Sequence, residues 1–131
     1  MELKVGMTYQ YSSIATPERS ARAMGSGGLP VFATPALVAM MECACYNCVK
    51  EAVPEGSTTV GTALNIKHLS ATPEGMNITA ECELIEIDRR RLTFRVAAFD
   101  ECGKIGEGTH ERFIVDVEKF MENANFKGDK E

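Results

Sequence analysis

The stretch TPALVAMMECACYNCV, residues 34–49, decides the fold of this 131-residue chain. Thr34 is a favoured helix N-cap, and Pro35 suits the first helical position because the N–H that proline lacks has no helical partner there. The residues from Pro35 to Val49 carry one charge, at Glu42, so they predict a helix that is apolar on every face and therefore buried. A helix of this length spans roughly 22 Å.

The hydropathy pattern changes to a period of two after this helix. It predicts strands at residues 57–70, 76–87, 91–99 and 105–117, and a further strand at 3–14 precedes the helix. Turn residues at 72–75, 88–90 and 100–103 separate the later strands, which are therefore expected to form an antiparallel meander of hairpins.

A single buried helix needs a sheet that curves around it. The sequence therefore predicts an α+β hotdog fold, a curved antiparallel sheet of about five strands wrapped around one long helix. Residues 1–120 are expected to form this one domain, and residues 121–131 a frayed tail. Because one sheet cannot cover the helix on all sides, we expect a homodimer or higher oligomer that joins edge strands and helices and forms a cleft between subunits.

Composition limits the partners and the compartment. The net charge of −5 argues against a nucleic-acid partner, because phosphate binding requires a basic face. The chain has no apolar stretch of about 18 residues, so no membrane span is expected. The start, MELKVGMTYQYSS, lacks a basic region followed by an apolar run, so no secretory signal is predicted. An odd number of cysteines, five, then favours reduced thiols and a cytoplasmic location.

Three residues stand out as candidates for chemistry: Thr34, Glu42 and His68. Thr34 is either an ordinary N-cap or part of a site, because unpaired N–H groups and the positive dipole end of the helix favour a developing oxyanion there. Glu42 is a carboxylate within a helix that is otherwise apolar, and an unpaired buried carboxylate costs several kcal/mol. It is either a structural residue with a partner or a site carboxylate. By strand alternation His68 shares the helix-facing side with Val60, Leu64 and Ile66, so it is expected to face Glu42.

Other polar and sulfur residues allow simpler interpretations. Cys43, Cys45 and Cys48 point around the helix in different directions and match no metal spacing, so small buried side chains are expected. His110 and Arg112 share one strand face, for which an exposed polar edge is the simplest interpretation.

An ordered set of motifs then adds a resemblance. These motifs are Val31–Thr34, Leu37–Glu42 with Ala44-Cys45, Gly61–Ala63 leading to His68, Ala71–Gly75, Gly106–Arg112 and Glu118–Phe120. Together they resemble the hotdog-fold thioesterases of the fluoroacetyl-CoA thioesterase type over roughly residues 3–120.

The resemblance implies a Thr–Glu–His catalytic set, which corresponds to Thr34, Glu42 and His68 and acts on acyl-CoA without metal or redox cofactor. It also implies that Gly61 lies near the active site and Arg112 near the acyl pocket. The phenylalanines that form a lid in the fluoroacetyl-specific enzyme are replaced here by the stretch GSGG at residues 25–28.

We therefore expect hydrolysis of a short-chain acyl-CoA thioester, in an open site that accepts acyl groups larger than acetyl. Two alternatives stay open at this point. One is a hotdog module that binds an acyl thioester or another small ligand without turnover, and the other is a cysteine-based redox or metal sensor.

Overall fold

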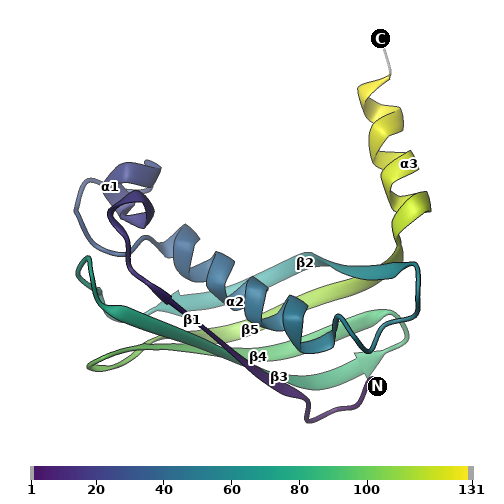
Figure 1. The fold of residues 1–131 in the computed structure, drawn as a ribbon, viewed down its shortest axis with the longest axis horizontal. Helices are drawn as coiled ribbons and strands as arrows, with labels where there is room; N and C mark the ends of the chain where they lie inside the picture. The colour runs from purple at the N-terminus through teal and green to yellow at the C-terminus, as the bar shows by residue number, and fades with distance from the viewer. Residues whose placement is uncertain (1, 130–131) are drawn as a thin grey trace.

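One long helix lies across the inner face of an antiparallel sheet in the computed structural model, which describes residues 2–129 (Figure 1). The strands are β1 (Thr8–Ile14), β2 (Ser57–His68), β3 (Asn77–Asp88), β4 (Arg91–Asp100) and β5 (Gly103–Asp116). The helices are η1 (Pro17–Arg19), α1 (Ala21–Met24), α2 (Thr34–Val49) and α3 (Val117–Gly128). The predicted architecture, five antiparallel strands around one long helix, is confirmed.

The strand order is β1-β3-β4-β5-β2, so the predicted four-stranded meander is wrong at its first connection. Hairpins join β3 to β4 and β4 to β5, but β2 pairs with β5 and forms an edge of the sheet. The segment after β2 therefore passes β5 and β4 to reach the position of β3, instead of turning back at residues 72–75. It is held on the way, since Phe32 N donates to Thr72 O and Thr72 Oγ1 donates to Asp100 Oδ2.

Helix α2 buries one face and leaves the other uncovered within one chain. Leu37, Met41, Ala44 and Cys45 are fully buried against the sheet. The opposite side carries the exposed Pro35, Ala39 and Tyr46 and the half-buried Val38, Glu42 and Cys43. The helix predicted to be buried all round is thus only half covered, and its free face is largely apolar.

Thr34 does not cap α2, contrary to the sequence prediction. The N-cap is Ala33, and Thr34 is the first helical residue with Pro35 next to it. The Thr34 hydroxyl instead lies 2.7 Å from His68 Nδ1. A side-chain partner on β2 has therefore displaced the local capping bond, so loss of this hydroxyl should not carry the usual cost of an N-cap.

A β-bulge in β2 changes which residues face the helix. The register with β5 shifts between Gly61 and Ala63, so that Gly61 pairs with Arg112 and Ala63 with Glu111. Arg112 is buried on the helix side, whereas Phe113, the partner of Val60, is exposed. The predicted helix-facing position of Val60 is therefore wrong, because one extra residue moves Gly61 onto that side.

The tail that was expected to fray from residue 121 is helical as far as Gly128, and residues 130 and 131 lie outside the described part of the chain. Helix α3 runs from Val117 to Gly128 and extends away from the sheet (Figure 1). Asp116 caps its N-terminus by accepting a hydrogen bond from Lys119 N at 2.9 Å. Asp116 is a favoured N-cap residue, so it marks the start of this helix, but the polar composition of the tail favoured a prediction without a helix.

Stability should depend on the absence of a side chain at Gly108. A Cβ atom there would lie 2.2 Å from Asn65 O and 2.7 Å from Ile66 Cα, both on the backbone of β2. We expect Gly108→Ala to lower the free energy of unfolding by about 3 kcal/mol or more, because β2 must move away from β5. Gly28→Ala is the control, since nothing lies within 4 Å of its Cβ position. Equal thermal midpoints for the two variants would contradict this account.

Candidate active site

The Thr34–His68 pair lies where the start of α2 meets the end of β2. Thr34 Oγ1 and His68 Nδ1 are 2.7 Å apart, a hydrogen bond whose direction depends on the histidine tautomer. The pair lines a cavity of about 310 Å³. Its other walls come from the segment before α2 and the segment after β2: Ala21, Ser26, Val31, Phe32, Leu69, Ser70 and Ala71.

The environment of His68 favours its neutral form. Burial lowers the pKa of His68, while the neighbouring backbone at Ser70 acts in the opposite direction. Its Nε2 atom is buried and has no hydrogen-bond partner among residues 2–129. With Nδ1 engaged by Thr34, Nε2 is the nitrogen left to give or accept a proton.

Glu42 lies in a second group of polar residues, around Gly61. A Cβ atom on Gly61 would be 2.9 Å from Glu42 Oε2 and 3.1 Å from His110 Cε1. The same point is 3.5 Å from Arg112 Nη1. A carboxylate, an imidazole and a guanidinium therefore converge on the space that glycine leaves open. The Glu42 carboxylate itself accepts no hydrogen bond within the described chain.

His110 and Arg112 are buried, which corrects the interpretation of an exposed polar edge. Their exposed fractions are 1% and 7%. Arg112 donates from Nε to Thr59 Oγ1 at 2.8 Å and from Nη2 to Thr59 O at 2.9 Å. Its Nη1 lies 3.1 Å from His110 Nε2, and its guanidinium lies 5.9 Å from the Tyr46 ring centre. Burial is the main influence that lowers the pKa of Arg112.

The structure thus joins the predicted residues in two groups rather than one. Thr34 contacts His68, while Glu42 lies with Gly61 and Arg112. Glu42 follows Thr34 by eight helical positions, which places them about 12 Å apart along the axis of α2. The expectation that His68 faces Glu42 is therefore not met within one chain.

Thr59 and Tyr46 were missed by sequence reasoning, although both hold Arg112. Thr59 is two residues before Gly61 in a strand, so alternation alone would have placed the two on one face. Tyr46 follows Glu42 by one helical turn, which puts both on one side of α2. A search for companions of the predicted site residues at these spacings could have found them.

Cys45, Cys48 and Cys82 belong to the core rather than to this site, whereas Cys43 is half-buried and Cys102 is exposed, so the predicted burial of Cys43 is wrong. Cys45 and Cys48 of α2 are buried beside Cys82 of β3, and all are free thiols. A hydrogen bond with Cys82 and burial raise the pKa of Cys48. A hydrogen bond with Cys45, followed by burial, raises the pKa of Cys82 to about 12. Residues 2–129 contain no cluster of three or more side chains suited to a metal ion.

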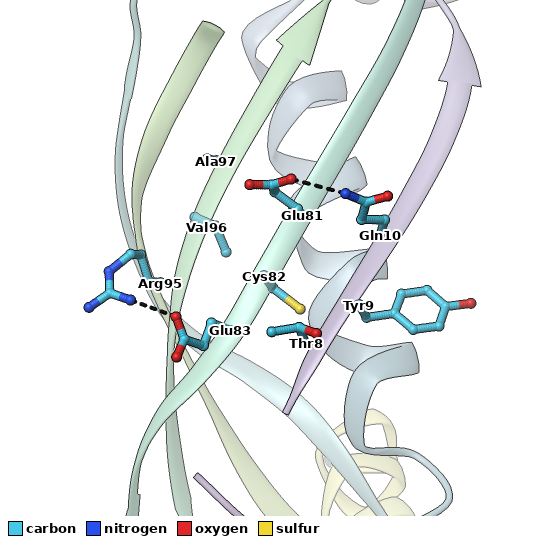
Figure 2. Close-up of a pocket in the computed structure, with 9 residues that line it drawn as sticks. All are labelled: Thr8, Tyr9, Gln10, Glu81, Cys82, Glu83, Arg95, Val96 and Ala97. Atoms are coloured by element: carbon cyan, nitrogen blue, oxygen red, sulfur yellow. Dashed lines mark hydrogen bonds and ion pairs between the residues drawn. The ribbon is translucent and has the colours of Figure 1, made fainter. Parts of the chain in front are cut away.

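A wider hollow, of about 520 Å³, lies over β1, β3 and β4 (Figure 2). Its polar side chains already pair with one another. Gln10 donates to Glu81 at 3.1 Å, and Arg95 forms an ion pair with Glu83 at 2.8 Å (Figure 2). It contains none of the predicted site residues. None of the helices within residues 2–129 has the length and apolar character needed to span a membrane.

Comparison with known proteins gives a consistent result. A family model described as fluoroacetyl-CoA-specific thioesterase matches residues 15–118. The fluoroacetyl-CoA thioesterase of Streptantibioticus cattleyicolor is 35% identical over 124 residues, which cover 90% of this chain and 89% of that protein. A solved structure of a fluoroacetyl-CoA thioesterase has a TM-score of 0.89 at 32% identity and covers all of both chains.

Two further structures widen this comparison. A mutant fluoroacetyl-CoA-specific thioesterase in complex with fluoroacetate and CoA has a TM-score of 0.85 at 34% identity, covering 90% of this chain and 99% of that chain. A Thermus thermophilus thioesterase superfamily member has a TM-score of 0.88 at 26% identity, covering 98% and 97%. The family match covers most of the chain, and the hotdog fold agrees with it. This chain belongs to the fluoroacetyl-CoA-specific thioesterase family.

Proposed function

We propose that this protein hydrolyses a short-chain acyl-CoA thioester to the free acid and CoA. The observation that carries the proposal is the hydrogen-bonded Thr34–His68 pair on a cavity at the N-terminus of α2. The chain belongs to a thioesterase family, and the structure of one member was solved with CoA, which supports the same chemistry.

Thioester hydrolysis needs an attacking oxygen, a proton carrier and a stabiliser for the developing oxyanion. His68 is the proton carrier, because Thr34 holds Nδ1 and leaves Nε2 for exchange. The first-turn N–H groups of α2 have no helical partners and lie at the positive end of the helix dipole. They are suited to hold the thioester oxygen beside the Thr34 hydroxyl.

Glu42 either attacks the carbonyl with its own carboxylate oxygen or takes a proton from a water molecule, whose oxygen then attacks. In the direct route the carboxylate forms an anhydride with the acyl group, CoA leaves as a thiol after gaining a proton, and water then cleaves the anhydride. In the other route the activated water attacks the carbonyl at once. Gly61 leaves space for the acyl group beside Arg112, which contributes to binding rather than to proton transfer.

A homodimer would bring the two residue groups together. Strand β2 is an edge strand, and two-fold pairing of β2 with a second copy would run the two strands antiparallel. Gly61 in the middle of β2, together with Glu42 of α2 beside it, would then lie towards the end of the partner's β2. The largely apolar free face of α2 would be covered in the same assembly.

The cytoplasm is the compartment that suits this reaction. The five cysteines are free thiols, including the neighbouring Cys45, Cys48 and Cys82 in the core. Thiols in such proximity stay reduced in a reducing compartment.

The open cavity leads to a prediction for the turnover of an acyl-CoA panel, measured by CoA release. The loop at residues 25–28 is exposed and has no aromatic side chain that could close the cavity. We expect hydrolysis of butyryl-CoA and similar short chains at least as fast as of acetyl-CoA and fluoroacetyl-CoA. A strong preference for fluoroacetyl-CoA would contradict the open site. Saturable binding of the panel without CoA release would favour the alternative of a binding module.

The pH dependence of kcat/KM should report His68. Because burial lowers its pKa, the neutral form should persist at lower pH than in an ordinary histidine, whose pKa is about 6.5. Activity that needs neutral His68 is present above its pKa and falls as protonation begins below it. We therefore expect an acid limb centred below pH 6.5. A midpoint above that value would contradict this role.

Mixing two inactive variants tests whether the site is shared. Glu42→Gln and His68→Ala should each lower kcat by about 10²-fold or more while remaining folded dimers by light scattering. In an equal mixture, half of the dimers are mixed, and each has one site with both residues intact. Exchange of subunits should thus restore about one quarter of wild-type activity.

The matched control is the double variant, Glu42→Gln with His68→Ala, mixed with either single variant. Neither of these mixtures contains an intact site, so neither should recover. An absence of recovery in the original mixture, with mixed dimers demonstrated by mass spectrometry, would place both residues within one chain. A stable monomer at micromolar concentration would contradict the assembly itself.

A further inference from the structure

His110 is a fully buried imidazole that the reaction outlined above does not use. Its Nδ1 lies 2.9 Å from Ala63 O, and a carbonyl oxygen can only accept, so Nδ1 carries the hydrogen. Its Nε2 lies 3.1 Å from Arg112 Nη1, and a guanidinium can only donate, so Nε2 carries a lone pair. Two partners of opposite character therefore fix one neutral tautomer.

The surroundings of His110 keep it in that form. Burial is the largest influence, and together with the charge of Arg112 it lowers the pKa of His110. The Ala63 carbonyl, Glu42 and Glu111 act in the opposite direction. The ring also stacks on the buried Phe94, with 6.5 Å between ring centres. A histidine enclosed in this way is poorly placed to exchange protons, but it is a well-positioned acceptor.

The His110 Nε2 acceptor matters because it holds the Nη1 end of Arg112, which faces Glu42. Thr59 takes the Nε–H and one Nη2–H, which leaves Nη1 to be fixed by His110. Nη1 and Glu42 Oε2 both lie within 3.5 Å of the Cβ position that Gly61 leaves empty. Without an acceptor at position 110, the guanidinium would lose the contact that holds this end beside the carboxylate.

We propose that His110 is a positioning residue for the thioesterase reaction, an acceptor that holds Arg112 beside Glu42 across the gap above Gly61. This inference rests on the proposed function of Glu42. His110 transfers no proton and does not touch the substrate. It acts through Arg112, whose fixed charge orients the carboxylate that begins the reaction.

The test is a double-mutant cycle on kcat/KM. His110→Phe keeps a ring of similar size against Phe94 but removes the acceptor, so we expect a loss of about tenfold or more. His110→Gln offers a carbonyl oxygen near the place of Nε2 and should recover most of that loss. In an Arg112→Met background, His110→Phe should have almost no further effect, because its target is gone.

A purely structural role would give other results. Equal losses for His110→Phe in both backgrounds, or a glutamine variant as slow as the phenylalanine variant at matched thermal stability, would overturn the proposal. Because a substitution in the core can impair folding, a second measurement on the unaltered protein is needed.

Nitrogen NMR of His110 supplies that measurement and does not depend on turnover. We expect a hydrogen on Nδ1, a lone pair on Nε2 and a neutral ring at pH values where an ordinary histidine is mostly protonated. An Nε2–H tautomer, or a charged ring under those conditions, would overturn the inference. If no acyl-CoA is hydrolysed but these signals are found, the proposed function fails and the arrangement of His110 and Arg112 stands.

Discussion

The close packing of α2 on the inner face of the sheet is the constraint on which the rest of the structure depends. Small residues make the approach possible: a Cβ atom at Gly106 would lie 2.9 Å from Leu37 Cδ2 and 3.1 Å from the backbone oxygen of Lys67. Because the helix rests this closely, its N-terminus brings Thr34 to the end of β2, and Glu42, two turns later, reaches Gly61. One packing distance therefore positions both groups of polar residues.

The elements could be predicted from the sequence because they follow from periodicity, but their neighbours could not. An apolar run with one charge identified α2, and alternation identified the strands. The bulge between Gly61 and Ala63 has no marker in that alternation, because an extra residue looks the same as its neighbours in a polar edge strand. Its consequence is large, since it turns Gly61 towards Glu42 and Val60 away.

The candidate residues were likewise predicted better than their contacts. Thr34 was identified, but its hydroxyl pairs with the imidazole of His68 rather than with the helix backbone. Periodicity could not reveal this partner, because His68 lies on β2, far from Thr34 in the sequence. His110 and Arg112 were placed on one strand face, yet alternation cannot reveal whether that face is covered. Burial of so polar a pair is tolerated because Thr59, Ala63 and the pair itself satisfy its donors and acceptors.

The two groups differ in how complete they are within one chain. The Thr34 hydroxyl pairs with His68 Nδ1, and Arg112 is held by Thr59 and His110, so each half can form as the monomer folds. Glu42 has a cation near it but no hydrogen bond in the described chain, and β2 has one unpaired edge. In the dimer that we propose, pairing along that edge would join the carboxylate of one copy to the proton carrier of the other. Catalysis would then require assembly, whereas folding of each chain would not.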